Sequence, residues 1–235
     1  MLVKNSQQDI IYDLPKHFKK IGLKLSGGAD SAMMGYLLCK YIKEERPDLI
    51  IVPVVVEKLI NKYHFKFSKL VLDFYKEQFP DIIFEDFQKT EQHEREDHNK
   101  VQHILLISLM EQKIIDCCFT GLTADPPDYV IFKHNGIIFE HPDRTRCKGQ
   151  FLKSTITAKG TSYKPLVNID KIGIFELYQQ FNLLDSLFIL TYSCESMSSA
   201  LTNNFERHCW SCWDCSERKW AFKNPNNIFD LKGES

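Results

Sequence analysis

Two glycines lie within a short stretch, Ser26-Gly27-Gly28-Ala29-Asp30-Ser31, that follows an apolar run and precedes a strongly helical segment. A strand, a glycine turn and a helix N-terminus in this order favour phosphate binding, because glycine lets the backbone approach an anion and the first helical N–H groups point at it. Ser26 and Ser31 add hydroxyl donors. The carboxylate of Asp30 suits such a site only when a divalent cation accompanies the phosphate. A glycine turn without a ligand is the alternative.

The stretch lacks the lysine of a Walker A loop and does not have the spacing G-x-G-x-x-G. It resembles the pyrophosphate loop S-G-G-x-D-S of the N-type ATP pyrophosphatases (PP-loop enzymes). This superfamily cleaves ATP between the α- and β-phosphates and adenylates a substrate. The resemblance implies that Ser26, Gly27, Gly28, Ala29, Asp30 and Ser31 bind ATP with Mg²⁺, and that Asp30 is catalytic.

Four cysteines near the C-terminus form a second group with chemical potential: Cys194, Cys209, Cys212 and Cys215. Two C-x-x-C steps plus one distant thiol suit a closed, tetrahedral Zn²⁺ site, and an iron–sulfur cluster is the rival interpretation. With all four ligand positions filled, the metal would stabilise the fold rather than catalyse.

Alternating apolar strands and amphipathic helices must position these residues. Leu49–Val56 is a nearly continuous apolar run, which is typical of a parallel strand buried on both faces, although Pro53 lacks a ladder donor. The order predicts a Rossmann-like, doubly wound α/β fold with a parallel sheet and a small C-terminal metal-binding helical part. The expected strands are Ile21–Leu25, Leu49–Val56, Ile82–Phe87 and Lys113–Thr120, and the expected helices are Ala29–Glu45, Lys66–Phe79, Val101–Gln112 and Asn168–Phe181.

Three other segments receive weaker interpretations. Asp9–Phe18 could form a short helix, and the polar stretch Gln88–Lys100 favours a solvated loop. Cys117 and Cys118 are adjacent on a strand, so they face opposite ways and are expected in the core rather than on one metal ion.

The region from residue 121 to 164 breaks the strand–helix alternation. Asn135-Gly136 between apolar runs predicts a β-hairpin beside the sheet. A basic segment follows, and it either forms a solvated surface or grips phosphates or an anionic substrate; its cations are Arg144, Arg146, Lys148, Lys153, Lys159 and Lys164. Lys171 falls in the first turn of the next helix, where a cation is disfavoured unless it faces an anion.

Composition sets the outer limits. The chain has 235 residues, 43% of them hydrophobic, and a net charge of −1, so only a local patch could attract nucleic acid. No apolar run approaches a membrane span, and Met1–Lys19 lacks a signal-peptide core, which leads us to expect a cytoplasmic protein without a membrane partner. We expect a main domain at 1–190 with the insertion at about 121–164, a metal-binding segment at 191–223 and a tail at 224–235.

Both ends of the chain resemble the 7-cyano-7-deazaguanine synthase family of PP-loop enzymes. The family combines the S-G-G-x-D-S loop with T-x-S-C and C-x-x-C-x-x-C-x-x-R-x-x-A-F, which here begin at Thr191 and Cys209 and include Arg218. A P-L-x-x-x-x-K segment between them is matched by Pro165-Leu166 and Lys171. The sequence departs from the family pattern at three places. In the middle, His98-Asn99 stands where the family has an Arg-Asn pair, and no Cys-Arg follows Pro127-Asp128. Beside the terminal cysteines, Glu195 and Trp210 replace the Tyr and Gly of the family.

The resemblance implies a ligase that adenylates 7-carboxy-7-deazaguanine, accepts ammonia and yields the amide and then the nitrile in deazapurine (queuosine) biosynthesis. Lys171 and the basic segment would neutralise the departing pyrophosphate, so Lys171 is the second catalytic candidate. The implied partners are the small deazapurine and ammonia. Nucleic acid is a less favoured partner, and a homodimer is one option for the oligomeric state. The alternatives are a PP-loop enzyme with another acceptor, such as a tRNA base for thiolation, a nucleic acid or a protein, and a catalytically silent nucleotide-binding module.

Overall fold

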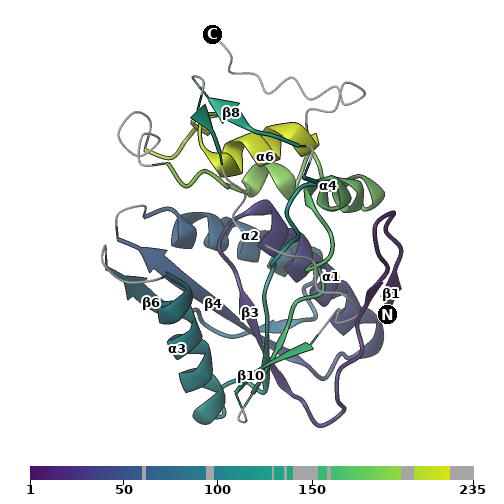
Figure 1. Ribbon diagram of the computed structural model, residues 1–235. Coiled ribbons are helices and arrows are strands. Elements are labelled where there is room, and N and C mark those ends of the chain that lie inside the picture. Colours follow the sequence, from purple (N-terminus) through teal and green to yellow (C-terminus); the bar gives the residue numbers. More distant parts are fainter. Residues whose placement is uncertain are drawn as a thin grey trace.

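A parallel β-sheet forms the centre of the computed structural model (Figure 1). The structure describes residues 1–59, 62–93, 98–128, 130–134, 137–139, 153–157, 160–196 and 204–222. The strands of the sheet are β3 (Lys20–Lys24), β4 (Ile50–Lys58), β5 (Ile83–Phe84), β6 (Gln88–Gln92), β7 (Cys117–Phe119), β10 (Lys153–Thr157) and β11 (Gly160–Tyr163). Their order is β10-β11-β7-β3-β4-β5, with β6 also paired to β4.

The strand order reverses at β3. The chain runs from β3 outward through β4 to β5 and β6, and then returns to the other side of β3 to form β7 and β11, all in parallel pairings. Among the described strands of this sheet, β10 alone is antiparallel to its neighbour. The predicted doubly wound α/β fold is therefore confirmed. The crevice between β3 and β7, at the carboxyl ends of the strands, is where such sheets place their ligands.

Helices cover both faces of the sheet (Figure 1). On one face α3 (His98–Glu111) packs Leu106 and Leu109 against Val52 and Val54. The other face carries most of the core. The helices of this face are α1 (Ala29–Glu45) and α2 (His64–Gln78). Outside them, α4 (Lys171–Gln180) packs against α1, α6 (Trp213–Phe222) packs against α4, and the 3₁₀ turn η1 (Phe188–Leu190) packs against α2.

The adjacent cysteines of β7 behave as predicted. Cys117 belongs to the core on the α1 face, whereas Cys118 packs with α3 on the opposite face, and both are buried. Burial raises the pKa of Cys118 to about 11 and raises that of Cys117 further. Both are therefore neutral core thiols.

Pro53 occupies an interior strand without breaking the ladder. The backbone of Val54 accepts a hydrogen bond from Leu25 on the β3 side, so Pro53, one residue earlier, turns its ring nitrogen to the other side. There β5 pairs only with Ile50 and Ile51, and β6 begins at Val54. The missing N–H therefore falls in the gap between two short partner strands, where no donor is required.

Several expected elements differ in the structure. The helix expected at Asp9–Phe18 is absent from the described residues, where β1 (Leu2–Val3) pairs with β2 (Ile10–Ile11) instead. The strand expected at Ile82–Phe87 is reduced to β5, and part of the expected polar loop is the edge strand β6. An edge strand gains backbone hydrogen bonds from β4 without burying its side chains, so its polar sequence gave no strand signal.

Residues 121–164 contain more strands than the one predicted hairpin. The hairpin is confirmed as β8 (Lys133–His134) paired with β9 (Ile137–Ile138), although its Asn135-Gly136 tip lies outside the described residues. The basic segment, which was expected to belong to an insertion beside the sheet, instead contributes β10 and β11 to the main sheet. Arg144, Arg146, Lys148, Lys159 and the tail at 224–235 lie outside the described residues, and only the backbone of Lys153 is described.

None of the helices in the described ranges has both the length and the apolar character that a membrane span requires.

Candidate functional site

The glycine loop is shaped by one left-handed residue. Gly27 has φ +77°, and a Cβ there would lie 2.5 Å from the Cβ of Phe67 on α2, so only glycine fits. Gly28 is the N-cap of α1 and supplies no side chain to the first helical N–H groups. The N-terminus of α1 therefore meets the pocket with uncapped backbone donors, as an anion-binding site requires.

Two serine hydroxyls organise the loop internally. The hydroxyl of Ser31 donates to the carbonyl of Gly28 at 3.0 Å and lies 3.1 Å from the hydroxyl of Ser26. The Gly28 N–H points at the Ser26 hydroxyl at 3.4 Å. These contacts hold both hydroxyls on the inner side of the turn. Ser26 and Ser31 also line the pocket on this side.

A second close approach brings β7 to the loop. A Cβ on Gly121, just beyond β7, would lie 2.7 Å from both the Cα and the N of Ser31. Glycine at this position lets the ends of β3 and β7 meet around the start of α1. The two strands therefore frame the crevice that the strand order predicts.

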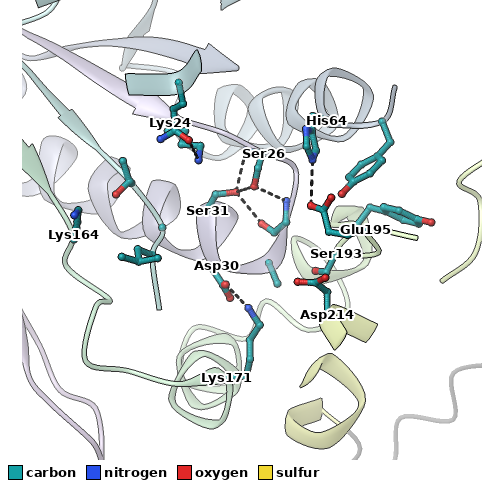
Figure 2. Close-up of a pocket in the computed structure, with 18 of the residues that line it drawn as sticks. Lys24, Ser26, Asp30, Ser31, His64, Lys164, Lys171, Ser193, Glu195 and Asp214 are labelled. Carbon is teal, nitrogen blue, oxygen red and sulfur yellow. Dashed lines mark hydrogen bonds and ion pairs between the residues drawn. The ribbon is translucent and has the colours of Figure 1, made fainter. Parts of the chain in front are cut away.

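A pocket of about 620 Å³ opens at this crevice (Figure 2). This volume lies within the range of small-molecule sites. Its walls come from the loop, the end of β3, α3, the segment after β7, the segment after β11 and the cysteine-bearing segment. The polar and charged residues that line it are Lys24, Ser26, Asp30, Ser31, His64, Gln102, His103, Thr120, Ser162, Lys164, Lys171, Ser193, Glu195 and Asp214.

Asp30 and Lys171, the two predicted catalytic residues, lie against each other (Figure 2). The Lys171 ammonium pairs with Oδ2 of Asp30 and lies 3.6 Å from Oε2 of Glu217, whose side chain is only 1% exposed. The Thr123 hydroxyl donates to the same Asp30 oxygen at 3.3 Å. The anion that Lys171 faces in this structure is therefore a pair of protein carboxylates.

The second Asp30 oxygen is different. Oδ1 is buried and has no hydrogen-bond partner in the described part of the protein. An orphaned carboxylate oxygen carries a desolvation cost that a cation would remove. Asp170, which directly precedes Lys171 in the chain, caps α4 by accepting a hydrogen bond from the Ile172 N–H at 2.9 Å. This cap fixes Lys171 at the first helical position, opposite Asp30.

Two further lysines line the pocket, and only Lys164 belongs to a segment that the sequence singled out. Lys24 ends β3, two residues before the loop, and its ammonium bonds to the side-chain oxygen of Gln102 on α3. Desolvation and then the like charge of Lys58 lower the pKa of Lys24 to about 8, against a weaker opposing effect of Glu195. The sequence signal was its position next to the loop.

Glu195 forms a second charged cluster on the pocket wall. Its carboxylate pairs with Lys58 at 2.6 Å and lies 3.6 Å from Nε2 of His64. Burial opposes ionisation of Glu195, but the nearby His64 ring and the charge of Lys58 outweigh it and hold the pKa below its usual value. The sequence marked Glu195 only as a departure from a family pattern, and nothing in it connected Lys58 or His64 to this position.

The four predicted metal ligands come together. The sulfurs of Cys194, Cys209, Cys212 and Cys215 all lie within 4.8 Å of one another, with Cys209–Cys215 at 3.8 Å and Cys212–Cys194 at 3.9 Å. Tetrahedral thiolates around one ion with bonds of about 2.3 Å are about 3.8 Å apart. The cluster therefore fits a metal site.

The cysteine-bearing segment is attached directly to the glycine loop. The Tyr192 N–H donates to the Gly27 carbonyl at 2.8 Å, and the Tyr192 ring stacks on Phe67 at 4.8 Å. Buried Arg218 on α6 donates to the hydroxyls of Thr191 and Ser193, both at 3.0 Å. These contacts fix the chain on both sides of Tyr192 and connect the metal site to the loop.

The matches to the family pattern are only partly visible. Asn99 lies in α3, but its side chain is outside the described set. Pro127 and Asp128 follow β7, and neither lines the pocket. Their roles stay predictions.

Comparisons with known proteins give little further guidance. No family model matches the sequence, and no curated protein matches it. A solved structure, the U34-tRNA thiolase NcsA from Methanococcus maripaludis with its 4Fe–4S cluster, is similar over 87% of this chain and 71% of its own, at 18% identity and a TM-score of 0.46. A likeness of this strength establishes neither the family nor the reaction of this chain.

Proposed function

We propose that the chain transfers AMP from ATP to an acceptor and releases pyrophosphate. The observation that carries the proposal is the position of the S-G-G-A-D-S loop: it opens α1 at the β3/β7 crevice and lines a pocket of about 620 Å³. Uncapped helix N–H groups and two hydroxyls suit the departing pyrophosphate. Preorganised donors of this kind stabilise charge that develops in the transition state.

Asp30 fits a role in holding Mg²⁺. Its buried Oδ1 has no partner among the described residues, while Oδ2 is fixed by Lys171 and Thr123. Mg²⁺ takes few protein ligands and completes its shell with phosphates and water, so one carboxylate oxygen suffices. When bound, the ion would neutralise phosphate charge. Lys171 would orient Asp30 and contribute positive charge at the pocket edge.

For the acceptor, the main proposal is the carboxylate of 7-carboxy-7-deazaguanine. A carboxylate oxygen attacks the α-phosphorus, the bond to the bridging oxygen breaks, and pyrophosphate leaves with the electron pair. Ammonia then attacks the acyl carbon, AMP departs, and loss of a proton gives the amide. The amide oxygen then attacks the α-phosphorus of a second ATP and pyrophosphate leaves again; departure of AMP with loss of two protons leaves the nitrile. The pocket holds the reactants together, which supplies much of the rate enhancement.

We propose Zn²⁺ for the four-cysteine site. Sulfur separations of 3.8 and 3.9 Å match the shell of one ion. In an iron–sulfur cluster the thiolates bind different iron atoms and are spaced more widely, so this rival is less favoured. The ion would hold Cys194 and α6 together and would leave no open position for catalysis.

The same site supports a second acceptor. Glu195 lines the pocket where the family pattern has tyrosine, which leaves the acceptor's identity open. A tRNA base, the kind of substrate named for the solved neighbour, is then the alternative, and modification of a protein or another nucleic acid belongs to the same class. A silent nucleotide-binding module is the remaining alternative.

The test incubates the purified chain with ATP, Mg²⁺, 7-carboxy-7-deazaguanine and ammonia, and in parallel with unmodified tRNA and a sulfur donor. We expect AMP and pyrophosphate as products, and loss of most activity in Asp30→Asn. Asp73→Asn, an exposed carboxylate on α2 paired with Lys69, is the matched control and should retain activity. ADP and orthophosphate as products, or nucleotide binding without turnover on any acceptor, would contradict the proposal.

A further inference from the structure

The charges around the pocket are divided between its two sides. Figure 2 shows Lys24 and Lys164 on one side of Ser26 and Ser31, with Glu195 on the other. Asp214 lies on the same side as Glu195 (Figure 2). The two lysines thus form a positive side of the pocket that is separate from the Asp30–Lys171 pair.

These lysines differ from Lys171 in what they contact. Lys171 is neutralised by two carboxylates. By contrast, within the described residues neither Lys24 nor Lys164 forms an ion pair, and the hydrogen-bond partner of Lys24 is the neutral amide of Gln102. A half-buried ammonium without a counter-charge is costly, and an anionic ligand would offset that cost.

Their position in the sheet is also specific. Lys24 ends β3, Lys164 follows β11, and β7 lies between these strands. Both side chains therefore reach the pocket beside the carboxyl end of β7, where Thr120 and Gly121 also line it. This is the switch point of the sheet, on the far side of the glycine loop from Glu195.

The opposite side of the pocket suits the nucleoside. The charge of Glu195 is balanced by Lys58, so among the described residues this side offers a phosphate or carboxylate no unpaired cation, while the carboxylates of Glu195 and Asp214 can accept hydrogen bonds from ribose hydroxyls. If the pyrophosphate lies at the N-terminus of α1 and the nucleoside lies beside Glu195, the space beside the two lysines is left for the acceptor.

We propose that Lys24 and Lys164 form the subsite that binds the carboxylate of the acceptor and holds it for attack on the α-phosphorus. The inference rests on the proposed adenylation and adds the residues that select an anionic acceptor. The two ammonium groups bind the carboxylate and orient it, and they take no part in bond making. Gln102 holds the Lys24 ammonium in place from α3.

The experiment compares Lys24→Met and Lys164→Met with the wild-type chain in pyrophosphate release, with 7-carboxy-7-deazaguanine and ATP varied separately. We expect the acceptor KM to rise about ten-fold or more in each variant, because a charge-assisted contact is lost, while the ATP KM stays within about two-fold. Lys24→Arg should retain much of the acceptor affinity. Lys69→Met, an exposed lysine outside the pocket, is the matched control.

Calorimetric binding of the acceptor separates the possible failures. The wild-type chain should bind 7-carboxy-7-deazaguanine better than 7-deazaguanine, which lacks the carboxylate, and both methionine variants should lose this preference. A rise in ATP KM alone, an unchanged acceptor KM in both variants, or no preference in the wild-type chain would overturn the subsite. Salt-sensitive tRNA binding that depends on both lysines, without binding of the carboxylated base, would also overturn it. The adenylation proposal fails separately, if ATP is not cleaved to AMP and pyrophosphate.

Discussion

Replacing Lys171 with methionine tests the charge network beneath the glycine loop. The substitution removes the ammonium between Asp30 and Glu217, whose side chains are 17% and 1% exposed. Removing one partner of a buried ion pair costs about 3 to 5 kcal/mol, since the remaining charge is left uncompensated. At about 3 kcal/mol, the midpoint of thermal unfolding of a chain of this size falls by roughly 6 to 12 °C.

A double-mutant cycle with Glu217→Gln separates this network from a simple loss of packing. The amide removes one of the two uncompensated charges, so Lys171→Met/Glu217→Gln should be at least as stable as Lys171→Met alone. Urea unfolding of the four proteins gives the coupling energy, which we expect to be at least about 1 kcal/mol. If the two losses simply add, Lys171 and Glu217 do not act as a pair, and the network that joins α6 to Asp30 through Lys171 is refuted.

Three other predictions follow from the same geometry. Removing the metal, by chelation or by Cys215→Ser, should both lower the unfolding midpoint and weaken ATP binding in calorimetry, because the cysteine-bearing segment is hydrogen-bonded to the glycine loop. A loss of stability with unchanged ATP affinity would contradict that coupling. Gly27→Ala should destabilise the chain by roughly 2 kcal/mol or more in urea unfolding, whereas Gly28→Ala, whose Cβ would meet nothing closer than 3.4 Å, should fold normally; equal losses would refute the assigned backbone strain. The pKa of Lys24 is lowered to about 8, so between pH 8 and the usual lysine pKa the unfolded chain binds more protons than the folded chain. The ligand-free wild type should therefore gain stability relative to Lys24→Met as pH rises through this window. A constant difference between their urea midpoints would refute the pKa shift.

The sheet could be predicted because its central strands are buried on both faces. Burial selects continuous apolar runs such as Leu49–Val56, and such runs are visible in one sequence. A proline in a central strand normally leaves a neighbouring acceptor without its N–H donor, so Pro53 counted against a central position for this run. The sequence did not reveal that Pro53 faces the gap between β5 and β6, where no donor is needed. The polar strand β6 was missed for a related reason, since an edge strand is held by backbone hydrogen bonds that leave little trace in side-chain type.

The candidate site was predictable where its residues are contiguous or closely spaced. The glycine loop and the cysteine motif each carry their chemistry in a short spacing, and the structure places the four sulfurs together. The partners of Asp30 and Glu195 come from elements far away in sequence, and only tertiary packing determines those pairs. Lys171 was expected to face an anion, but that the anion would be Asp30 with Glu217 depends on how α4 and α6 pack.

The cysteine-bearing segment lines the same pocket as the glycine loop, and this limits what a metal bound to the cysteines could do. The Tyr192 N–H bonds to the carbonyl of Gly27, whose left-handed backbone gives the loop its shape. On the other side, Glu217 of α6 contacts the same lysine that fixes Asp30. The segment therefore touches the loop through the Tyr192 backbone and reaches Asp30 through Lys171. Since Cys194 and Cys215 lie two residues from Tyr192 and Glu217, a metal that fixes these cysteines also fixes both contacts, and it can shape nucleotide binding without touching the nucleotide.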